Sequence, residues 1–499
     1  MNGCMAETKS GVVRGYEREG IREYLGIPYA RPPVGELRLK RAVPYAWEGI
    51  YDAAGYGEPS VQYENGELLG SEDCLTLNIR TPLTGEKLPV LVYIHGGGFN
   101  TGSASLPLYD GKAFARQGIV YVSMQYRLNV WGFYDFTVYP AGKDFDSNCG
   151  LSDQILAMRW IHENIEAFGG DPDRVTIAGE SAGGTSMLNM IGAPGAKGTF
   201  RQAIISSAVP NAYFTHAQSK EDMDLFLEGM GWEEGDVAKL KTVDAYAVQK
   251  GNTYMSDRHQ YKNPGFFLQS PVLDDLLPQR PLDAVREGAA AGIKIMIGTN
   301  RHEGSMFVRP EKTIFPNSWE MIEEMFRKNG HEDAFAAVRD YYEPRNGRKI
   351  NGIGLGFIDF ATDYAFQVPA VKLARAQKKY GDVWMYRFDF ASDFMTEIGL
   401  LAGHAMELPY VFHKKDFGWM AEEQKRPQKD VVNALADKMH ASWVEFVKNG
   451  DPMQGKWPQY EDHDGVGKVC IYDAETHIED LDRRELMKLW GDMKFYGGG

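Results

Sequence analysis

The sequence is poor in cysteine and lacks the long apolar runs that are typical of membrane proteins. Only four cysteines occur among 499 residues, and neither C-x-x-C nor H-x-x-x-H spacing is present, which argues against a zinc site. No apolar stretch approaches the roughly 18 residues that a membrane span needs, and the first residues lack the apolar region of a signal peptide. We therefore expect a protein with no bound metal and no membrane association.

Basic residues are also fewer than acidic residues. With 54 basic and 69 acidic residues the net charge is −15, which disfavours binding to nucleic acid or to anionic membranes and mildly favours neutral or cationic substrates. The length alone suggests about three domains. However, the chain has no internal repeat and no low-complexity linker, so we expect a single catalytic domain over residues 1–499, as a monomer or weak homo-oligomer.

A G-x-S-x-G pentapeptide runs from Gly179 to Gly183 and is centred on Ser181. A β-rich run over residues 174–178 precedes it, and a helix-compatible stretch over residues 185–191 follows it. A serine hydroxyl needs a sharp strand-to-helix turn to expose its oxygen and a nearby base to take its proton. Ser181 is therefore a candidate nucleophile, although the pentapeptide alone also occurs in ordinary turns.

A second glycine cluster, Gly96-Gly-Gly98, ends the apolar run over residues 88–94. Glycine backbone can turn its N–H groups outward, and such donors stabilise the oxyanion formed in acyl transfer. We assign Gly97 and Gly98, together with the N–H of Ala182, to an oxyanion hole. A phosphate cradle is the competing interpretation, but no G-K-[ST] follows and the spacing is not G-x-G-x-x-G. His95, beside this cluster, is expected to orient the loop.

The remaining members of a catalytic triad should lie downstream of the serine, at the ends of later strands. Glu303 follows the apolar run over residues 293–298, and His404 follows the run over residues 383–388. We predict Glu303 as the acid and His404 as the base. His302 adjoins Glu303 but is expected to be solvated. No cofactor is expected.

Taken together, these motifs resemble the type-B carboxylesterases, the cholinesterase and p-nitrobenzyl esterase family of α/β-hydrolases. The resemblance extends over nearly the whole chain. Its further motifs are Leu25-Gly-Ile-Pro-Tyr-Ala30, Pro32-Pro-Val-Gly-Glu-Leu-Arg38, Ser71-Glu-Asp-Cys-Leu-Thr-Leu-Asn78, Tyr126-Arg-Leu-Asn-Val-Trp-Gly-Phe133 and Asn148-Cys-Gly-Leu-Ser-Asp-Gln154. It implies an α/β fold with a large, mostly parallel central sheet flanked by helices, and the same triad and oxyanion hole. It also suggests two framework ion pairs, Arg38 with Glu72 and Arg127 with Asp153.

The resemblance also bears on the cysteines and the compartment. Secreted members of the family bridge the cysteine at the position of Cys74 to a second cysteine on the same loop, and Ser60 stands at that second position here. The resemblance therefore implies four free thiols, and we expect a cytoplasmic, bacterial protein.

Two segments, about 212–262 and 312–356, have a mixed, largely helical pattern and are expected to be insertions that roof the active site as lid or regulatory regions. Aromatic and methionine side chains near the motifs are candidates for lining the substrate pocket. They are Phe99, Phe214, Met306, Phe307 and Met406.

The predicted function is hydrolysis of small, neutral, largely apolar esters through an acyl-enzyme. Three alternatives stay open. A non-catalytic adhesion protein of the same fold is disfavoured by the intact triad. A cholinesterase-like enzyme is disfavoured because the loop from Ser60 to Cys74 has no tryptophan to bind a quaternary ammonium group. A specialised esterase for feruloyl, aryl or toxin esters would carry the same triad.

Overall fold

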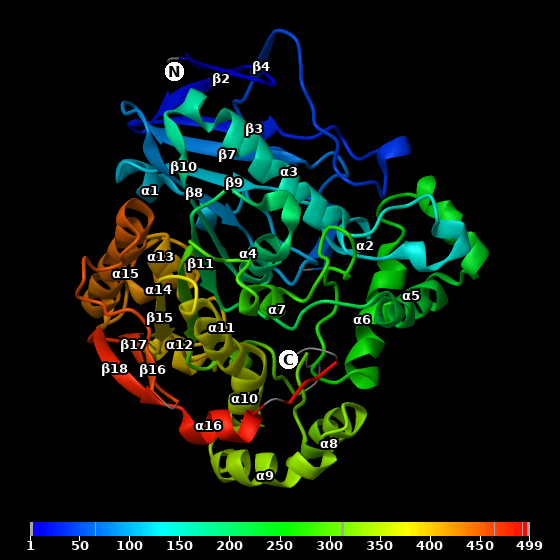
Figure 1. Ribbon diagram of the computed structural model, residues 1–499, viewed down its shortest axis with the longest axis vertical. Coiled ribbons are helices and arrows are strands. Elements are labelled where there is room, and N and C mark those ends of the chain that lie inside the picture. Colours follow the sequence, from blue (N-terminus) through cyan, green and yellow to red (C-terminus); the bar gives the residue numbers. More distant parts are fainter. Residues whose placement is uncertain (1–2, 65, 311–313, 464, 492, 497–499) are drawn as a thin grey trace. The chain divides into compact units, whose positions relative to one another are not determined.

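The computed structural model describes residues 3–64, 66–310, 314–463, 465–491 and 493–496 (Figure 1). The chain divides into two compact units. The first comprises Met1–Ala203, Tyr213–Arg258 and Leu268–Pro281, and the second comprises Ile204–Ala212, His259–Phe267 and Leu282–Gly499.

The first unit contains a mixed sheet whose central strands are parallel. Its strands are β1 (Gly3–Thr8), β2 (Gly11–Arg18), β3 (Ile21–Pro28), β4 (Ile50–Asp52), β7 (Thr76–Pro82), β8 (Leu88–Ile94), β9 (Val120–Met124) and β10 (Gly170–Glu180). The order is β1-β2-β3-β7-β9-β8-β10, with β4 beside β2. Strands β9, β8 and β10 pair in parallel, whereas the steps from β1 to β9 are antiparallel (Figure 1). Strands β8 and β9 are almost wholly buried, which is why they read as continuous apolar runs.

The second unit contains a smaller set of parallel and antiparallel strands. Its strands are β11 (Gln202–Ser206), which begins with two residues of the first unit, β12 (Lys294–Asn300), β15 (Val383–Phe388), β16 (Asp462–His463), β17 (Val466–Tyr472) and β18 (His477–Asp482). The order is β11-β12-β15-β17-β16, with β18 also beside β17. Strands β12, β15 and β17 are parallel, and β16 and β18 run antiparallel to β17. Short hairpins elsewhere pair β5 (Gln62–Glu64) with β6 (Glu67–Leu69) and β13 (Lys349–Ile350) with β14 (Ile353–Gly354).

Helices flank both sets of strands. Those of the first unit are α1 (Lys112–Arg116), α2 (Asn129–Gly132), α3 (Cys149–Asn164), α4 (Ala182–Gly192), α5 (His216–Met230) and α6 (Gln249–Lys262), the last of which ends in the second unit. Those of the second unit begin with α7 (Pro281–Arg286), whose first residue belongs to the first unit. They continue with α8 (Trp319–Lys328), α9 (Glu332–Tyr342), α10 (Leu355–Thr362), α11 (Val368–Lys378), α12 (Asp393–Glu397), α13 (Leu408–Val411), α14 (Gly418–Glu423), α15 (Lys429–Asn449) and α16 (Arg484–Trp490). Within the described segments, none of these helices combines the length and the apolar character that a membrane crossing requires.

Both segments predicted as insertions are largely helical, and residues 312 and 313 of the second lie outside the described residues. In the first unit, Met223 and Phe226 of α5 are buried in one apolar cluster with Trp131 and Tyr134. In the second unit, α8 and α9 contribute to another cluster that also contains residues of α10 and α16. Each segment therefore has an apolar anchor within its own unit.

Both framework ion pairs that the resemblance suggested are confirmed. The Arg127 guanidinium donates to the two carboxylate oxygens of Asp153 at 2.9 and 2.6 Å, and both side chains are buried. Arg38 donates from Nε to Glu72 at 2.6 Å and from Nη1 to the carbonyls of Leu240 and Val243. Arg38 thus ties the N-terminal region to the first predicted insertion, segment 212–262.

Candidate active site

Ser181 occupies the sharp turn between β10 and α4. Its backbone has φ 59° and ψ −124°, a conformation that is unfavourable for a residue with a side chain. The residue is half-buried, whereas its neighbours on both sides are buried. The turn therefore exposes the serine on an otherwise enclosed segment, as the pentapeptide predicted.

The two glycines of the pentapeptide are required by packing. A Cβ on Gly183 would lie 2.1 Å from the carbonyl oxygen of Ile94, at the end of β8. A Cβ on Gly179 would lie 2.5 Å from backbone atoms of Gly183. The turn can therefore close against β8 only if both positions lack a side chain.

The glycine cluster after β8 adjoins this turn. Gly97 and Gly98 have φ 102° and 62°, and the N–H groups of Asn100 and Thr101 both donate to the Gly97 carbonyl at 3.0 Å. A Cβ on Gly96 would lie 3.1 Å from the Cβ of Ser181, so the start of the cluster touches the serine. A Cβ on Gly98 would meet no atom within 4 Å, so this residue borders open space.

Ala182 is the first residue of α4, and the first N–H groups of a helix have no carbonyl partner within it. The positive end of the helix dipole lies at the same place. The structure thus places the start of the glycine cluster against Ser181 and the first N–H group of α4 at the same turn, within the first unit.

His95 has the structural role that was predicted for it. Its ring stacks on Tyr126 with 4.5 Å between centroids, and the Tyr126 hydroxyl donates to the His95 carbonyl at 2.8 Å. Burial lowers the pKa of His95 to about 4, so the imidazole is neutral near pH 7. These contacts hold the backbone from which the glycine cluster begins.

The second unit holds Glu303 and His404 in direct contact. Glu303 opens a short 3₁₀ turn, Glu303–Met306, that follows β12, and its carboxylate is fully buried. His404 Nδ1 lies 2.6 Å from Glu303 Oε2. Because this hydrogen bond joins Nδ1 to a carboxylate, it fixes the tautomer in which Nε2 is free of hydrogen and can act as a base.

Two residues that sequence reasoning missed hold the carboxylate in place. The other oxygen of Glu303 accepts hydrogen bonds from the Asn300 N–H and the Ser207 hydroxyl, both at 2.6 Å. The Asn300 side-chain amide also donates to the Gly403 carbonyl and to Glu407, which fixes the loop that carries His404. Asn300 ends β12 and Ser207 directly follows β11, so polar residues at the carboxyl ends of neighbouring strands were the available signal.

Aromatic rings enclose the imidazole of His404. Phe307, predicted to line the pocket, lies 4.7 Å from the His404 ring between centroids, and Phe366, which was not predicted, lies at 5.0 Å. Apolar rings beside an ion pair exclude water and strengthen its electrostatic interaction. Met306 is half-buried in the 3₁₀ turn, and Met406 is buried two residues after His404.

The other two predicted lining residues are buried in the first unit. The Phe99 ring packs on Phe133 with 4.4 Å between centroids, and Phe214 forms an isolated bridge with Val272. His302, which was expected to be solvated, is partly exposed, and burial lowers the pKa of its imidazole to about 4, so the ring is neutral near pH 7. Among the residues that the structure describes, no three His, Cys, Asp or Glu side chains are grouped as a metal site.

Known proteins match this chain over almost its full length. A family model described as "Carboxylesterase family" matches residues 3–488. The para-nitrobenzyl esterase of Bacillus subtilis (strain 168) is 37% identical over 486 residues, covering 95% of each protein, and the phenmedipham hydrolase of Pseudarthrobacter oxydans is 31% identical over 496 residues, covering 96% of this chain and 97% of that protein.

Solved structures give the same result. A PNB esterase superposes with a TM-score of 0.84 at 35% identity, and a carboxylesterase of Geobacillus stearothermophilus superposes with a TM-score of 0.81 at 32% identity. Each match covers 97% of this chain and 99% of the other.

Proposed function

The chain belongs to the carboxylesterase family and is a carboxylic ester hydrolase with the α/β-hydrolase fold; from this premise we propose that Ser181, His404 and Glu303 are its nucleophile, base and acid. The observation that carries the proposal is the buried hydrogen bond between His404 Nδ1 and Glu303 Oε2. A carboxylate enclosed at this position stabilises the imidazolium that forms when histidine accepts a proton.

In the proposed mechanism, His404 takes the Ser181 proton while the serine oxygen attacks the ester carbonyl. The tetrahedral oxyanion accepts hydrogen bonds from the N–H groups of Gly97, Gly98 and Ala182. His404 then protonates the departing alcohol, and a water molecule activated by the same histidine cleaves the acyl-enzyme. The strained backbone at Ser181 and the positive φ angles of the two glycines support these roles.

We propose small, neutral, largely apolar esters as substrates. The support is the aromatic enclosure of His404 by Phe307 and Phe366 and the name of the related para-nitrobenzyl esterase. Met306, Met406, Phe99 and Phe214 are proposed to line the same pocket. Choline esters are disfavoured because the loop from Ser60 to Cys74 carries no tryptophan. Specialised feruloyl, aryl or toxin esters remain a second substrate class.

The proposal extends to the organisation of the protein. We propose one catalytic domain over residues 1–499 in which the segments 212–262 and 312–356 act as lid or regulatory regions, and a monomer or weak homo-oligomer that does not bind nucleic acid. A bacterial cytoplasm is proposed because all four cysteines are free thiols and Ser60 stands where secreted members of the family carry the partner of Cys74.

Replacing the nucleophile tests the proposal. Ser181→Ala should lower kcat for p-nitrophenyl butyrate by about 10⁴-fold or more, as removal of a triad member does in other serine hydrolases. Ser442→Ala, at a buried position on α15 outside both predicted insertions, is the matched control and should keep normal turnover. A sulfonyl fluoride should label the wild type at Ser181 and leave Ser181→Ala unlabelled. Near-normal turnover of Ser181→Ala, or labelling at another serine, would contradict the assignment.

A further inference from the structure

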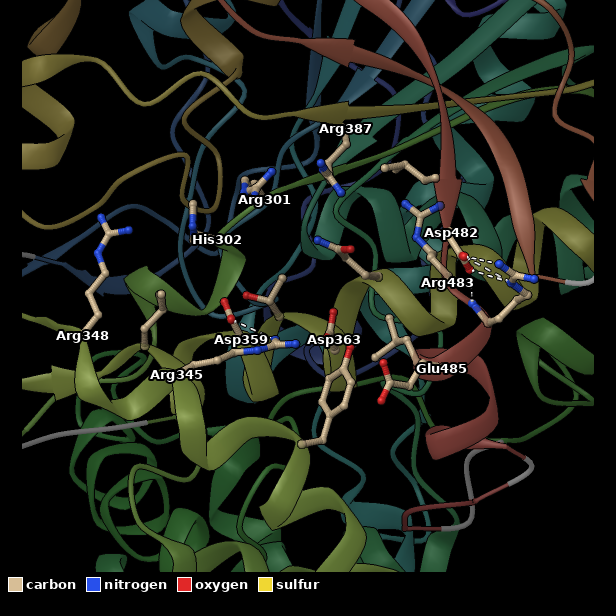
Figure 2. Close-up of a pocket in the computed structure, with 17 residues that line it drawn as sticks. Arg301, His302, Arg345, Arg348, Asp359, Asp363, Arg387, Asp482, Arg483 and Glu485 are labelled. Carbon is tan, nitrogen blue, oxygen red and sulfur yellow. Dashed lines mark hydrogen bonds and ion pairs between the residues drawn. The ribbon is translucent and has the colours of Figure 1, made fainter.

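A cavity of about 770 Å³ lies within the second unit (Figure 2). Residues from five parts of the chain line it: the segment before Glu303, the end of α9 with the 3₁₀ turn that follows it, α10 with the π-helical turn that follows it, β15, and the junction of β18 with α16. A cavity of this size holds a small organic molecule rather than a single ion.

The lining is rich in arginine. Six arginine side chains and four carboxylate side chains contribute to it, although the whole chain carries a net charge of −15. Several of the arginines are neutralised by ion pairs. Arg345 pairs with Asp359 at 3.0 Å, and Arg484 pairs with Asp482 at 2.6 Å. Because arginines outnumber carboxylates in the lining, the cavity keeps positive charge that these ion pairs do not balance.

Arg483 has the least compensated charge of the six. Its side chain is only 7% exposed, and its buried Nη1 has no hydrogen-bond partner. Within the described part of the chain, no carboxylate forms an ion pair with it. Burial and the neighbouring Arg387 lower the pKa of its guanidinium to about 10, so it remains charged at neutral pH. Removing such a charge from water is unfavourable unless a partner compensates it.

Arg387 lies next to Arg483 and is held in a fixed orientation. It donates from Nε and Nη2 to the two carboxylate oxygens of Asp389, each at 2.6 Å. Figure 2 shows Arg387 and Arg483 on one side of the cavity and Asp359 and Asp363 on the opposite side. One side is thus suited to an oxyanion, which planar guanidinium groups bind through paired hydrogen bonds, and the other can accept hydrogen bonds from hydroxyl or ammonium groups.

We propose that this cavity is a second binding site, for a small organic molecule that carries a phosphate or carboxylate group together with hydroxyl or ammonium groups. Arg483 binds the oxyanion with help from Arg387, and Asp359 and Asp363 accept hydrogen bonds from the opposite end of the ligand. The site is distinct from the proposed ester-hydrolysing residues, since none of Ser181, Glu303 and His404 lines the cavity.

Isothermal titration calorimetry at fixed ionic strength tests the proposal with the full-length protein. The probes are glucose 6-phosphate, gluconate, glucose and inorganic phosphate. We expect glucose 6-phosphate or gluconate to bind at least tenfold more tightly than either glucose or inorganic phosphate. If glucose 6-phosphate binds more tightly than gluconate, the preferred oxyanion is a phosphate; if gluconate binds more tightly, it is a carboxylate. Absence of binding by both at 10 mM, or equal binding of inorganic phosphate, would overturn the proposal.

Variants then locate the binding. Arg483→Met should weaken binding of the tighter probe at least tenfold. Arg327→Met, at an exposed arginine of α8 that pairs with Glu324, is the control and should change it less than twofold. Since a change at a buried position can disturb folding, Arg387→Met provides a second test and should weaken binding at least fivefold, because Asp389 keeps its ion pair with Arg301 in this variant. Wild-type affinity in a folded Arg387→Met, or in a folded Arg483→Met, would refute the assigned site.

Discussion

Replacing Glu303 with glutamine should reduce kcat for ester hydrolysis by about 10³- to 10⁴-fold while leaving the fold intact. The carboxylate is fully buried and lies 2.6 Å from His404 Nδ1, so its charge acts on the imidazolium with little screening by water. Two unit charges about 4 Å apart at an effective dielectric constant of about 20 interact by about 4 kcal/mol. Loss of that energy in the transition state corresponds to about 10³-fold in rate.

The hydrogen bonds around Glu303 account for a further loss. Its second oxygen accepts from the Asn300 N–H, which can only donate, and from the Ser207 hydroxyl. A glutamine would therefore place its oxygen at this position and its NH₂ group toward His404. Nδ1 would then have to accept, which moves the imidazole proton to Nε2 and blocks its action as a base. This wrong tautomer raises the expected loss toward about 10⁴-fold.

The assay is steady-state hydrolysis of p-nitrophenyl butyrate, with thermal unfolding of each variant as the test of folding. KM should change little, because the carboxylate acts on the imidazole and not on the bound ester. Glu423→Gln is the matched control, since Glu423 is a buried carboxylate of the same unit that accepts from the Ser392 hydroxyl. It should stay within about threefold of the wild type. A Glu303→Gln enzyme within tenfold of the wild type, or an equal loss in the control, would refute the reasoning.

Three further predictions follow from burial and packing. Burial raises the pKa of Asp363 from 3.8 to about 7, so the folded protein binds more protons than the unfolded chain between these values and loses stability as pH rises through them. Asp363→Asn should therefore be stabilised relative to the wild type more at pH 8 than at pH 5, as measured by urea unfolding. Gly183→Ala should lose about 1–3 kcal/mol or more in the same assay, because its Cβ would lie 2.1 Å from the Ile94 oxygen. The thiols of Cys74, Cys149 and Cys470, whose pKa burial raises to about 12, should resist Ellman's reagent in the native protein, and four thiols should react in denaturant without prior reduction.

A specific result would contradict each of these three predictions. A difference between Asp363→Asn and the wild type that does not vary with pH would show that this carboxyl ionises normally in the folded protein. Wild-type stability of Gly183→Ala would mean that the turn can move away from β8. Recovery of only two thiols in denaturant would reveal a disulfide and would contradict a reducing compartment.

Local sequence patterns were sufficient to predict the elements that carry the active-site residues. The apolar runs at 88–94 and 383–388 coincide with β8 and β15. The run at 174–178 is only part of β10, which extends over Gly170–Glu180, because residues 171–173, Asp-Pro-Asp, interrupt the apolar pattern and are at least partly exposed. Runs of buried residues predict strands well, and their polar ends are less certain.

The contacts that support Glu303 could not be predicted in this way. Ser207 lies 96 residues before Glu303, and the two meet because of where β11 and β12 end. The Ser207 N–H donates to the Gly298 carbonyl of β12, and Gly298 pairs with Tyr386 of β15. Strand register of this kind depends on long-range pairing, which a single sequence does not specify. The burial of the Arg483 guanidinium within this cavity escaped prediction for the same reason, since the cavity is formed by five segments that are distant in the sequence.

The steric requirement at Gly179 and Gly183 has an evolutionary consequence. Both positions exclude a Cβ because of neighbouring backbone atoms, and this exclusion acts whether or not Ser181 performs chemistry. Selection for folding alone would therefore preserve the two glycines in a descendant that had lost its esterase activity. In such a lineage only the central serine would be free to drift, so the identity of that residue, and not the glycine pattern around it, would separate catalytic from non-catalytic descendants.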